Sequence, residues 1–302
     1  MALWIPITIG AAFAQNLRFM LQKHLRATGL STGGATFARF VFAFPLAGIL
    51  AGALLIMRGE TLPTFGARFW IFSSLGGLSQ IIATMCVVAL FAQRNFAVGI
   101  TFKKTEVVLA AIFGFVVLGD RISTNGFLAI IVGLIGVIIL SDKPDLKSVK
   151  KWYHPLWNKS AALGITSGAL FGFSGIAYRG ASLSLGHGDF LLRATITLAC
   201  VTAFQTLVMA IFLWVKEQGE LQRVFAAWRV TALVGLTGMI GSWFWFMAFT
   251  LQNAAYVKAL GQIELVFTFI GSYFVFKERN STRELIGIAL VVLSILLLVL
   301  WR

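Results

Sequence analysis

Eight charged residues lie inside apolar stretches of this sequence, and their types and spacing could do chemistry. Six are basic and two are acidic: Arg18, Arg39, Lys103, Lys104, Arg193, Lys258, Glu106 and Glu264. A buried ammonium or guanidinium group binds anions such as carboxylates and phosphates. A buried carboxylate can balance such a cation or exchange a proton. The basic excess therefore predicts a binding site for a small anion.

The spacing of these residues separates their roles. Lys103 and Glu106 are three positions apart and would share one helix face, whereas Lys104 projects about 100° away and cannot face the same glutamate. Glu106 and Glu264 lie about 15 Å into their apolar stretches, near the midplane of a bilayer core of about 30 Å. An ion pair that only supports the structure is the alternative role for Lys103, and the role of Lys104 is left open.

Helix direction predicts where the basic residues gather. The first predicted span, 3–22, runs toward the membrane face from which the second and fourth predicted spans, 33–57 and 96–118, start. A basic vestibule near that face would therefore contain Arg18, Arg39, Lys103 and Lys104. Arg193 and Lys258 would lie in the opposite half of the membrane. Snorkelling to the lipid headgroups is the alternative role for the three arginines and for Lys258.

Two uncharged side chains add to the candidate site. Asn16 is in the middle of its helix and either lines a cavity or hydrogen-bonds across helices, and Trp245 either stacks on a substrate or contacts lipid. The two cysteines and three histidines lack metal-ligand spacing, and the sequence shows no nucleophile beside a base and no phosphate-binding loop. We therefore expect no metal, no cofactor and no enzyme activity.

Membrane-spanning helices must position these residues, because the composition excludes a soluble domain. The chain has 302 residues, of which 59% are hydrophobic and 12% charged, and its mean hydropathy is +0.89. About 20 helical residues cross a bilayer, and ten stretches are long enough: 3–22, 33–57, 69–91, 96–118, 124–141, 159–178, 188–215, 228–250, 254–276 and 282–301. We predict an all-α membrane protein with ten transmembrane helices, multi-pass, and in the inner membrane if it is bacterial. The first stretch lacks a basic leader and a cleavage site, so we expect it to be retained.

The net charge of +14 would suggest nucleic acid binding in a soluble protein. Here the basic residues flank the predicted spans and determine topology instead. Connections on one side of the membrane hold 14 lysines and arginines, whereas the other connections and the termini hold five. The positive-inside rule therefore places both termini outside the cytoplasm.

An internal repeat divides the chain. Glu264 follows Glu106 by 158 residues, and Asn253 follows Asn95 by the same number. Each half holds five predicted spans, and an odd number of crossings makes the second half enter from the opposite face, as in the inverted repeats of secondary transporters. The predicted units are a first five-helix repeat at 1–141, a basic connecting loop at 142–158 and a second five-helix repeat at 159–302.

Two short motifs follow the same repeat. Leu118-Gly119-Asp120-Arg121 and Phe276-Lys277-Glu278-Arg279 end the fourth and ninth predicted spans, and glycines follow in the next spans. These features resemble the drug/metabolite transporter superfamily with its EamA-type repeat. The resemblance implies a ten-helix transporter with both termini in the cytoplasm, opposite to the charge count. The family commonly has Glu-Pro in the middle of these two helices, and this chain lacks both prolines.

A narrower likeness concerns the lysines. Lys103-x-x-Glu106 and Val257-Lys258-Ala259-Leu260 are similar to motifs of the triose-phosphate translocator branch, which implies that Lys103 and Lys258 bind an anionic group. The adjacent arginine of the second motif is replaced by Ala259.

These observations predict a secondary transporter that moves a small organic metabolite, anionic through a carboxylate or phosphate, by alternating access. Lys103, Lys258 and the paired Arg39 and Arg193 would meet the anion, while the two buried glutamates tune those cations or couple transport to protons. The alternatives are an exporter of amino acids or amphiphilic drug-like compounds, a lipid-headgroup flippase component, and a membrane sensor. The expected partners are the substrate and membrane lipids, with no nucleic acid, and a homodimer is left open.

Overall fold

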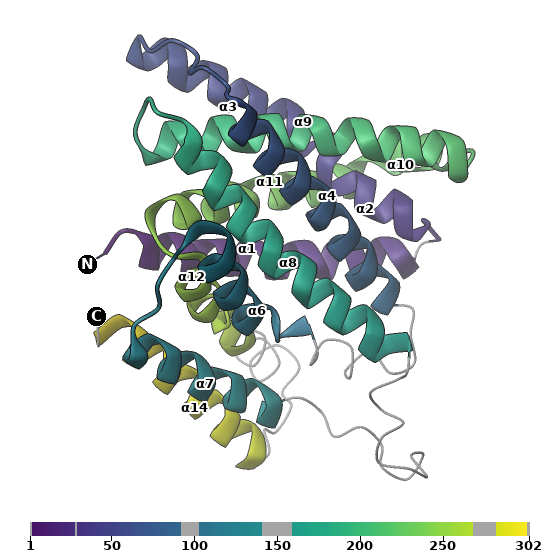
Figure 1. Ribbon diagram of the computed structural model, residues 1–302. Coiled ribbons are helices and arrows are strands. Elements are labelled where there is room, and N and C mark those ends of the chain that lie inside the picture. The colour runs from purple at the N-terminus through teal and green to yellow at the C-terminus, as the bar shows by residue number, and fades with distance from the viewer. Residues whose placement is uncertain (1, 28, 92–102, 141–158, 268–281, 301–302) are drawn as a thin grey trace.

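The structure is a computed structural model that describes all of the chain except residues 1, 28, 92–102, 141–158, 268–281 and 301–302. The described residues form a bundle of helices joined by short turns (Figure 1). The predicted loop at 142–158 and the second motif at 276–279 lie outside the described residues.

The helix bounds follow the apolar stretches of the sequence. In chain order the described helices are α1 (Trp4–Ala27), α2 (Thr32–Val41), α3 (Ala43–Arg58), α4 (Ala67–Leu90), α6 (Glu106–Phe113), the π-helical η1 (Gly114–Leu118), α7 (Thr124–Leu140), α8 (Lys159–Ser184), α9 (Phe190–Lys216), α10 (Glu220–Ala226), α11 (Trp228–Leu251), α12 (Ala254–Leu260) and α14 (Thr282–Leu300).

Several of these helices are long and apolar enough to cross a bilayer. Five candidates are α2 with α3, α4, α8, α9 and α11, and shorter apolar helices occur in α6 with η1, in α7 and in α14. The chain is thus a multi-pass helical membrane protein, as predicted. Each of the ten predicted spans overlaps at least one described helix. The ten-crossing inverted arrangement itself stays a prediction.

Two helices differ from the simple apolar rod that the sequence predicted. α1 has 24 residues but is not among the five apolar candidates, because Gln15, Asn16 and Arg18 interrupt its second half. The predicted span 33–57 is divided between α2 and α3. Pro45 has no N–H to donate to the carbonyl oxygen four residues earlier, so the hydrogen-bond ladder of the helix is interrupted there.

The helices of the two halves of the chain interleave. α1 packs along α11, α4 along α8, α2 and α3 against α9, α6 against α12, and α7 along α14. In the order of the predicted spans these pairs are one with eight, three with six, two with seven, four with nine and five with ten. A two-fold axis that relates the halves would exchange the pair of spans one and eight with the pair of spans three and six. It would leave the remaining three pairs unchanged. The internal repeat itself stays a prediction.

Asp189 fixes the start of α9. Its carboxylate accepts hydrogen bonds from the Leu192 N–H at 2.9 Å and from Arg58 Nη1 at 2.7 Å. Desolvation acts to raise the pKa of Asp189, but these donors outweigh it and hold the pKa below its ordinary value. The stabilisation is therefore present at neutral pH and is lost when acid protonates the carboxylate.

Replacement of this helix cap gives a first testable prediction. Asp189→Ala should lower the free energy of unfolding by about 1 kcal/mol at neutral pH, because the cap is lost. Equilibrium unfolding of the purified protein in detergent measures the change. Asp189→Asn keeps an oxygen acceptor and should lose less. An alanine variant as stable as the wild type would contradict the capping role.

Candidate functional site

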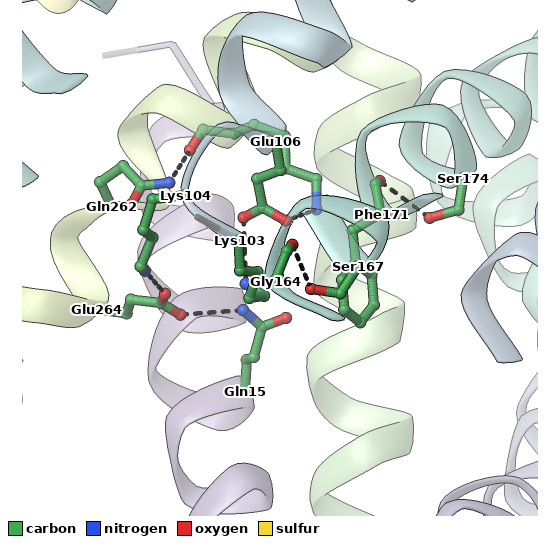
Figure 2. A network of polar contacts seen from close by, with 11 residues as sticks. Gln15, Lys103, Lys104, Glu106, Gly164, Ser167, Phe171, Ser174, Gln262 and Glu264 are labelled. Atoms are coloured by element: carbon green, nitrogen blue, oxygen red, sulfur yellow. Dashed lines mark hydrogen bonds and ion pairs between the residues drawn. The ribbon is translucent and has the colours of Figure 1, made fainter. Parts of the chain in front are cut away.

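Most of the charged residues singled out in the sequence meet in one buried cluster. Lys103, Lys104 and Glu106 lie at the start of α6, Lys258 lies in the last turn of α12, and Glu264 follows that helix. The paired side chains are 4–13% exposed. Figure 2 shows the α6 residues and Glu264 directed toward one another, with Gln15 of α1 beside them.

Glu106 balances two lysines. Lys103 Nζ lies 3.4 Å from Glu106 Oε1, and Lys258 Nζ lies 3.7 Å from Glu106 Oε2. The first contact is the pairing that the three-residue spacing predicted. The second joins the two halves of the chain. Lys258 therefore joins the cluster of the first-half residues, and its place in the opposite half of the membrane stays a prediction.

Lys104 pairs with the glutamate of the other half. Its ammonium group forms an ion pair with Glu264 Oε1, and Gln15 Nε2 donates to Glu264 Oε2 at 3.0 Å. The prediction that Lys104 points away from Glu106 is thus consistent with the structure, which gives it a separate partner. Each glutamate accepts a lysine from the opposite half, so the two ion pairs connect the repeats.

Both helices that carry the glutamates are interrupted at the cluster. Regular α-helix gives way to a turn at Lys104 and Thr105 before α6, and again at Gly261 and Gln262 after α12, while the backbone of Thr105 and Gly261 stays right-handed. The sequence predicted continuous spans there and lacks the prolines that would indicate a break. Discontinuous helices expose backbone groups that bind substrates and ions in secondary transporters. The two breaks lie at nearly equivalent positions of the repeat.

A glycine of α8 lets the start of α6 approach closely. A Cβ atom on Gly168 would lie 2.8 Å from the Lys103 carbonyl oxygen, which is too close for any other residue. α8 also carries Ser167, whose hydroxyl donates to the Gly164 carbonyl at 2.8 Å (Figure 2). The close approach of α8 holds the backbone that places Lys103.

Aromatic rings surround the lysine of α12. Lys258 Nζ lies 5.0 Å from the Trp245 ring centroid, 5.6 Å from Phe249 and 5.7 Å from Phe171. Lys103 Nζ lies 5.3 Å from the same Phe171 ring. Rings at these distances stabilise a cation. Trp245 is buried and faces Lys258 rather than lipid.

Arg18 and Arg39 are also buried, at 2% and 4% exposure, and so do not snorkel to the membrane surface. The Arg18 guanidinium lies 4.5 Å from the Phe19 ring, and Lys103 Nζ lies 5.7 Å from the same ring. This ring connects Arg18 to the lysine cluster, and the basic vestibule itself stays a prediction. Arg39 Nη1 donates to Thr84 at 2.9 Å.

Two predicted site residues are less closely involved. Arg193 lies in the first turn of α9 and is half-buried, and no described contact joins it to the cluster. Its alignment with Arg39 does not give it an equivalent environment, because Arg39 lies near the end of α2 and Arg193 near the start of α9. Asn16 is half-buried, and its neighbour Gln15 makes the hydrogen bond to the cluster.

Sequence reasoning missed several residues that complete the site: Phe19, Thr84, Phe171, Ser242 and Phe249. All are uncharged, so nothing in their burial distinguishes them from ordinary packing residues. Among the described residues, no group of three or more histidine, cysteine or carboxylate side chains could hold a metal ion.

Comparison with known proteins concerns both the sequence and the fold. Residues 158–300 match the EamA-like transporter family. No curated protein matches the sequence. The crystal structure of a protein of 15% sequence identity is similar, with a TM-score of 0.64 over 97% of this chain and 99% of that chain. The two chains therefore share a fold along nearly their whole length.

Proposed function

We propose that this multi-pass membrane protein, whose residues 158–300 match the EamA-like transporter family, moves a small organic anion across the membrane by alternating access. The family match supports a general transport role. The anionic character of the substrate, the inverted repeats and the roles of individual residues are our proposal.

The charge balance of the buried cluster carries the proposal. Five buried basic side chains accompany two carboxylates in this cluster and its adjoining arginines: Arg18, Arg39, Lys103, Lys104 and Lys258 with Glu106 and Glu264. A buried charge without a counter-charge is strongly unfavourable inside a membrane protein. A bound anion supplies the negative charge that these basic side chains lack. The excess of basic side chains over carboxylates therefore favours an anionic substrate over a neutral or cationic one.

The ion pairs suggest how binding couples to movement. An anion that approaches Lys103 and Lys258 competes with Glu106 for both ammonium groups. These two lysines come from different halves of the chain. When they leave Glu106 and bind the anion, the contact between the halves therefore changes. The helix breaks beside Lys104 and Gly261 give the backbone a place to bend. Glu106, once displaced, takes up a proton or turns toward another cation.

Transport measurements on Lys103 test this proposal. Protein reconstituted in liposomes should take up carboxylates or phosphate esters faster than neutral or cationic metabolites. Lys103→Ala should slow that uptake about 10- to 100-fold, because a hydrogen bond to a charged group is worth about 1.5 to 3 kcal/mol. Lys258 still balances Glu106 in this variant, so the fold should persist.

Arg68 provides the matched control. It is exposed at the start of α4 and contacts the Phe72 ring, so Arg68→Ala removes one positive charge away from the cluster and should leave uptake unchanged. Equal uptake of anions, neutral compounds and cations, together with intact uptake by Lys103→Ala, would exclude the proposed function.

A further inference from the structure

Two buried arginines, Arg18 and Arg39, form no ion pair with a carboxylate in the described part of the chain. We infer that Arg18 and Arg39 form a subsite for a doubly charged oxyanion, the phosphoryl group of a phosphate monoester. The inference rests on the proposed function and narrows it, since it assigns the substrate class to a position beside the Lys103 and Glu106 pair.

Arg18 is a cation without a hydrogen-bond acceptor. Both of its terminal nitrogens, Nη1 and Nη2, are buried and have no hydrogen-bond partner among the described residues. The face of the Phe19 ring lies 4.5 Å from its guanidinium carbon and stabilises the cation in part. Glu264 also attracts Arg18 electrostatically, but its carboxylate is already paired with Lys104. These interactions are weak beside the cost of burying a charge. The geometry therefore points to an acceptor that a ligand provides.

Arg39 is held in place by neutral groups. Its Nη1 donates to Thr84 Oγ1 at 2.9 Å and its Nη2 donates to Ser242 Oγ at 3.2 Å, while Nε has no partner. The Thr84 hydroxyl donates onward to the Gln80 carbonyl oxygen at 2.8 Å, so it accepts from Arg39 in a fixed orientation. These hydroxyls orient the guanidinium group but do not neutralise it.

A glycine of α11 brings the two arginine side chains together. A Cβ atom on Gly238 would lie 3.1 Å from Arg39 Cγ and 3.5 Å from Arg18 Cδ. The two stems therefore pass the same point of α11. Two like charges placed so close repel each other, and a shared anion removes that repulsion.

The number of charges selects the class of anion. The lysine part of the cluster holds three ammonium groups and two carboxylates, and the arginine pair adds two cations and no further carboxylate. A phosphate monoester carries about −1.5 to −2 at neutral pH and accepts hydrogen bonds from the planar guanidinium groups of both arginines. A monocarboxylate would balance only one of them.

The position of Phe19 indicates how the rest of such a substrate lies. The ring lies 4.5 Å from the Arg18 guanidinium carbon and 5.7 Å from Lys103 Nζ. A phosphoryl group bound at Arg18 and Arg39 therefore places the remaining part of the molecule next to Lys103 and the Phe171 ring. The subsite is continuous with the lysine cluster rather than separate from it.

Binding to the purified full-length protein tests the subsite with three probes that share a phenyl ring. Phenyl phosphate is a dianion, phenyl sulfate is a tetrahedral monoanion, and benzoate is a planar monoanion. Isothermal titration should give phenyl phosphate an affinity at least about tenfold above that of the other two. Arg18→Met should weaken phenyl phosphate binding about 10- to 100-fold and leave the benzoate affinity within about threefold.

A second measurement separates binding from a structural role. Arg18→Met removes a buried charge that lacks an acceptor, so its thermal midpoint without ligand should equal or exceed that of the wild type. Arg18→Lys keeps the charge but not the guanidinium geometry and should bind with intermediate affinity. Arg68→Met is the control and should bind all three probes as the wild type does.

The possible outcomes distinguish this inference from the proposed function. Equal affinities for the three probes, unchanged phosphate affinity in Arg18→Met, or a lowered thermal midpoint in that variant would each overturn the subsite. Anion uptake that still depends on Lys103 would in those cases leave the proposed function standing. If no probe binds to the wild type, the subsite is wrong, and the liposome assay decides the proposed function separately.

Discussion

Glu106→Gln is expected to lower the free energy of unfolding by about 3 to 5 kcal/mol. Glu106 is the described counter-charge of both Lys103 and Lys258, at 3.4 and 3.7 Å, and all three side chains are buried. Glutamine keeps the shape and the hydrogen-bonding oxygen but removes the charge. Two buried ammonium groups then lack a partner, which is the arrangement that destabilises proteins most strongly. Equilibrium unfolding in detergent measures the loss.

Removal of a lysine should restore part of that stability. In a Lys103→Met background, Glu106→Gln leaves only Lys258 without a partner, so its effect should be smaller than in the wild type. A double-mutant cycle gives the interaction free energy directly, and neighbours in contact usually couple by about 0.5 to 3 kcal/mol. Additive effects of the two substitutions would show that Glu106 and Lys103 do not interact. The proposal that a substrate anion replaces Glu106 as the partner of Lys103 would then have no basis.

The sequence predicted which charged side chains of the site pair only where the two residues are close together along the chain. Lys103 and Glu106 are one helical turn apart, and their pairing follows from helix geometry alone. The partner of Lys104 could not be predicted in the same way. Glu264 lies 160 residues away, and its contact with Lys104 depends on how helices of different halves cross. The internal repeat identified Glu264 as important without identifying what it binds.

The fold was predicted from the lengths of the apolar stretches, and the differences have specific causes. Pro45 divides the second predicted span. α10 was not expected, and it forms where Glu220 is buried and accepts from the Ser31 N–H at 2.7 Å at the start of α2. Hydropathy averages a stretch and therefore does not register a single missing donor or a single buried carboxylate. The breaks beside Lys104 and Gly261 escaped for the same reason.

The arrangement of the ion pairs gives the two glutamates a common role. Glu106 holds a lysine of the second half and Glu264 holds a lysine of the first half. A movement of one half relative to the other must therefore break or replace both contacts. An anion that takes over one lysine weakens one of the two links between the halves, whereas a neutral substrate has no comparable effect on them.

Exchange of the charges of Lys104 and Glu264 tests that link. Lys104→Glu alone places two buried carboxylates together, and Glu264→Lys alone places two ammonium groups together. Each single variant should lower the free energy of unfolding by about 3 to 5 kcal/mol. The double variant Lys104→Glu with Glu264→Lys restores opposite charges and should regain most of the loss. Gln15 can turn its amide so that the oxygen faces the new ammonium group.

An exposed ion pair provides the comparison for this exchange. Arg58 pairs with Asp189 at 2.7 Å, but both side chains are well exposed, at 31% and 46%. Arg58→Ala should therefore lower the free energy of unfolding by less than about 1 kcal/mol. A large loss in both single variants of the buried pair, with recovery in the double variant, requires that Lys104 and Glu264 meet in the folded protein. A double variant no more stable than the single variants would mean that the segments of Lys104, before α6, and Glu264, after α12, do not meet. The anion could then not act on the two halves through these lysines.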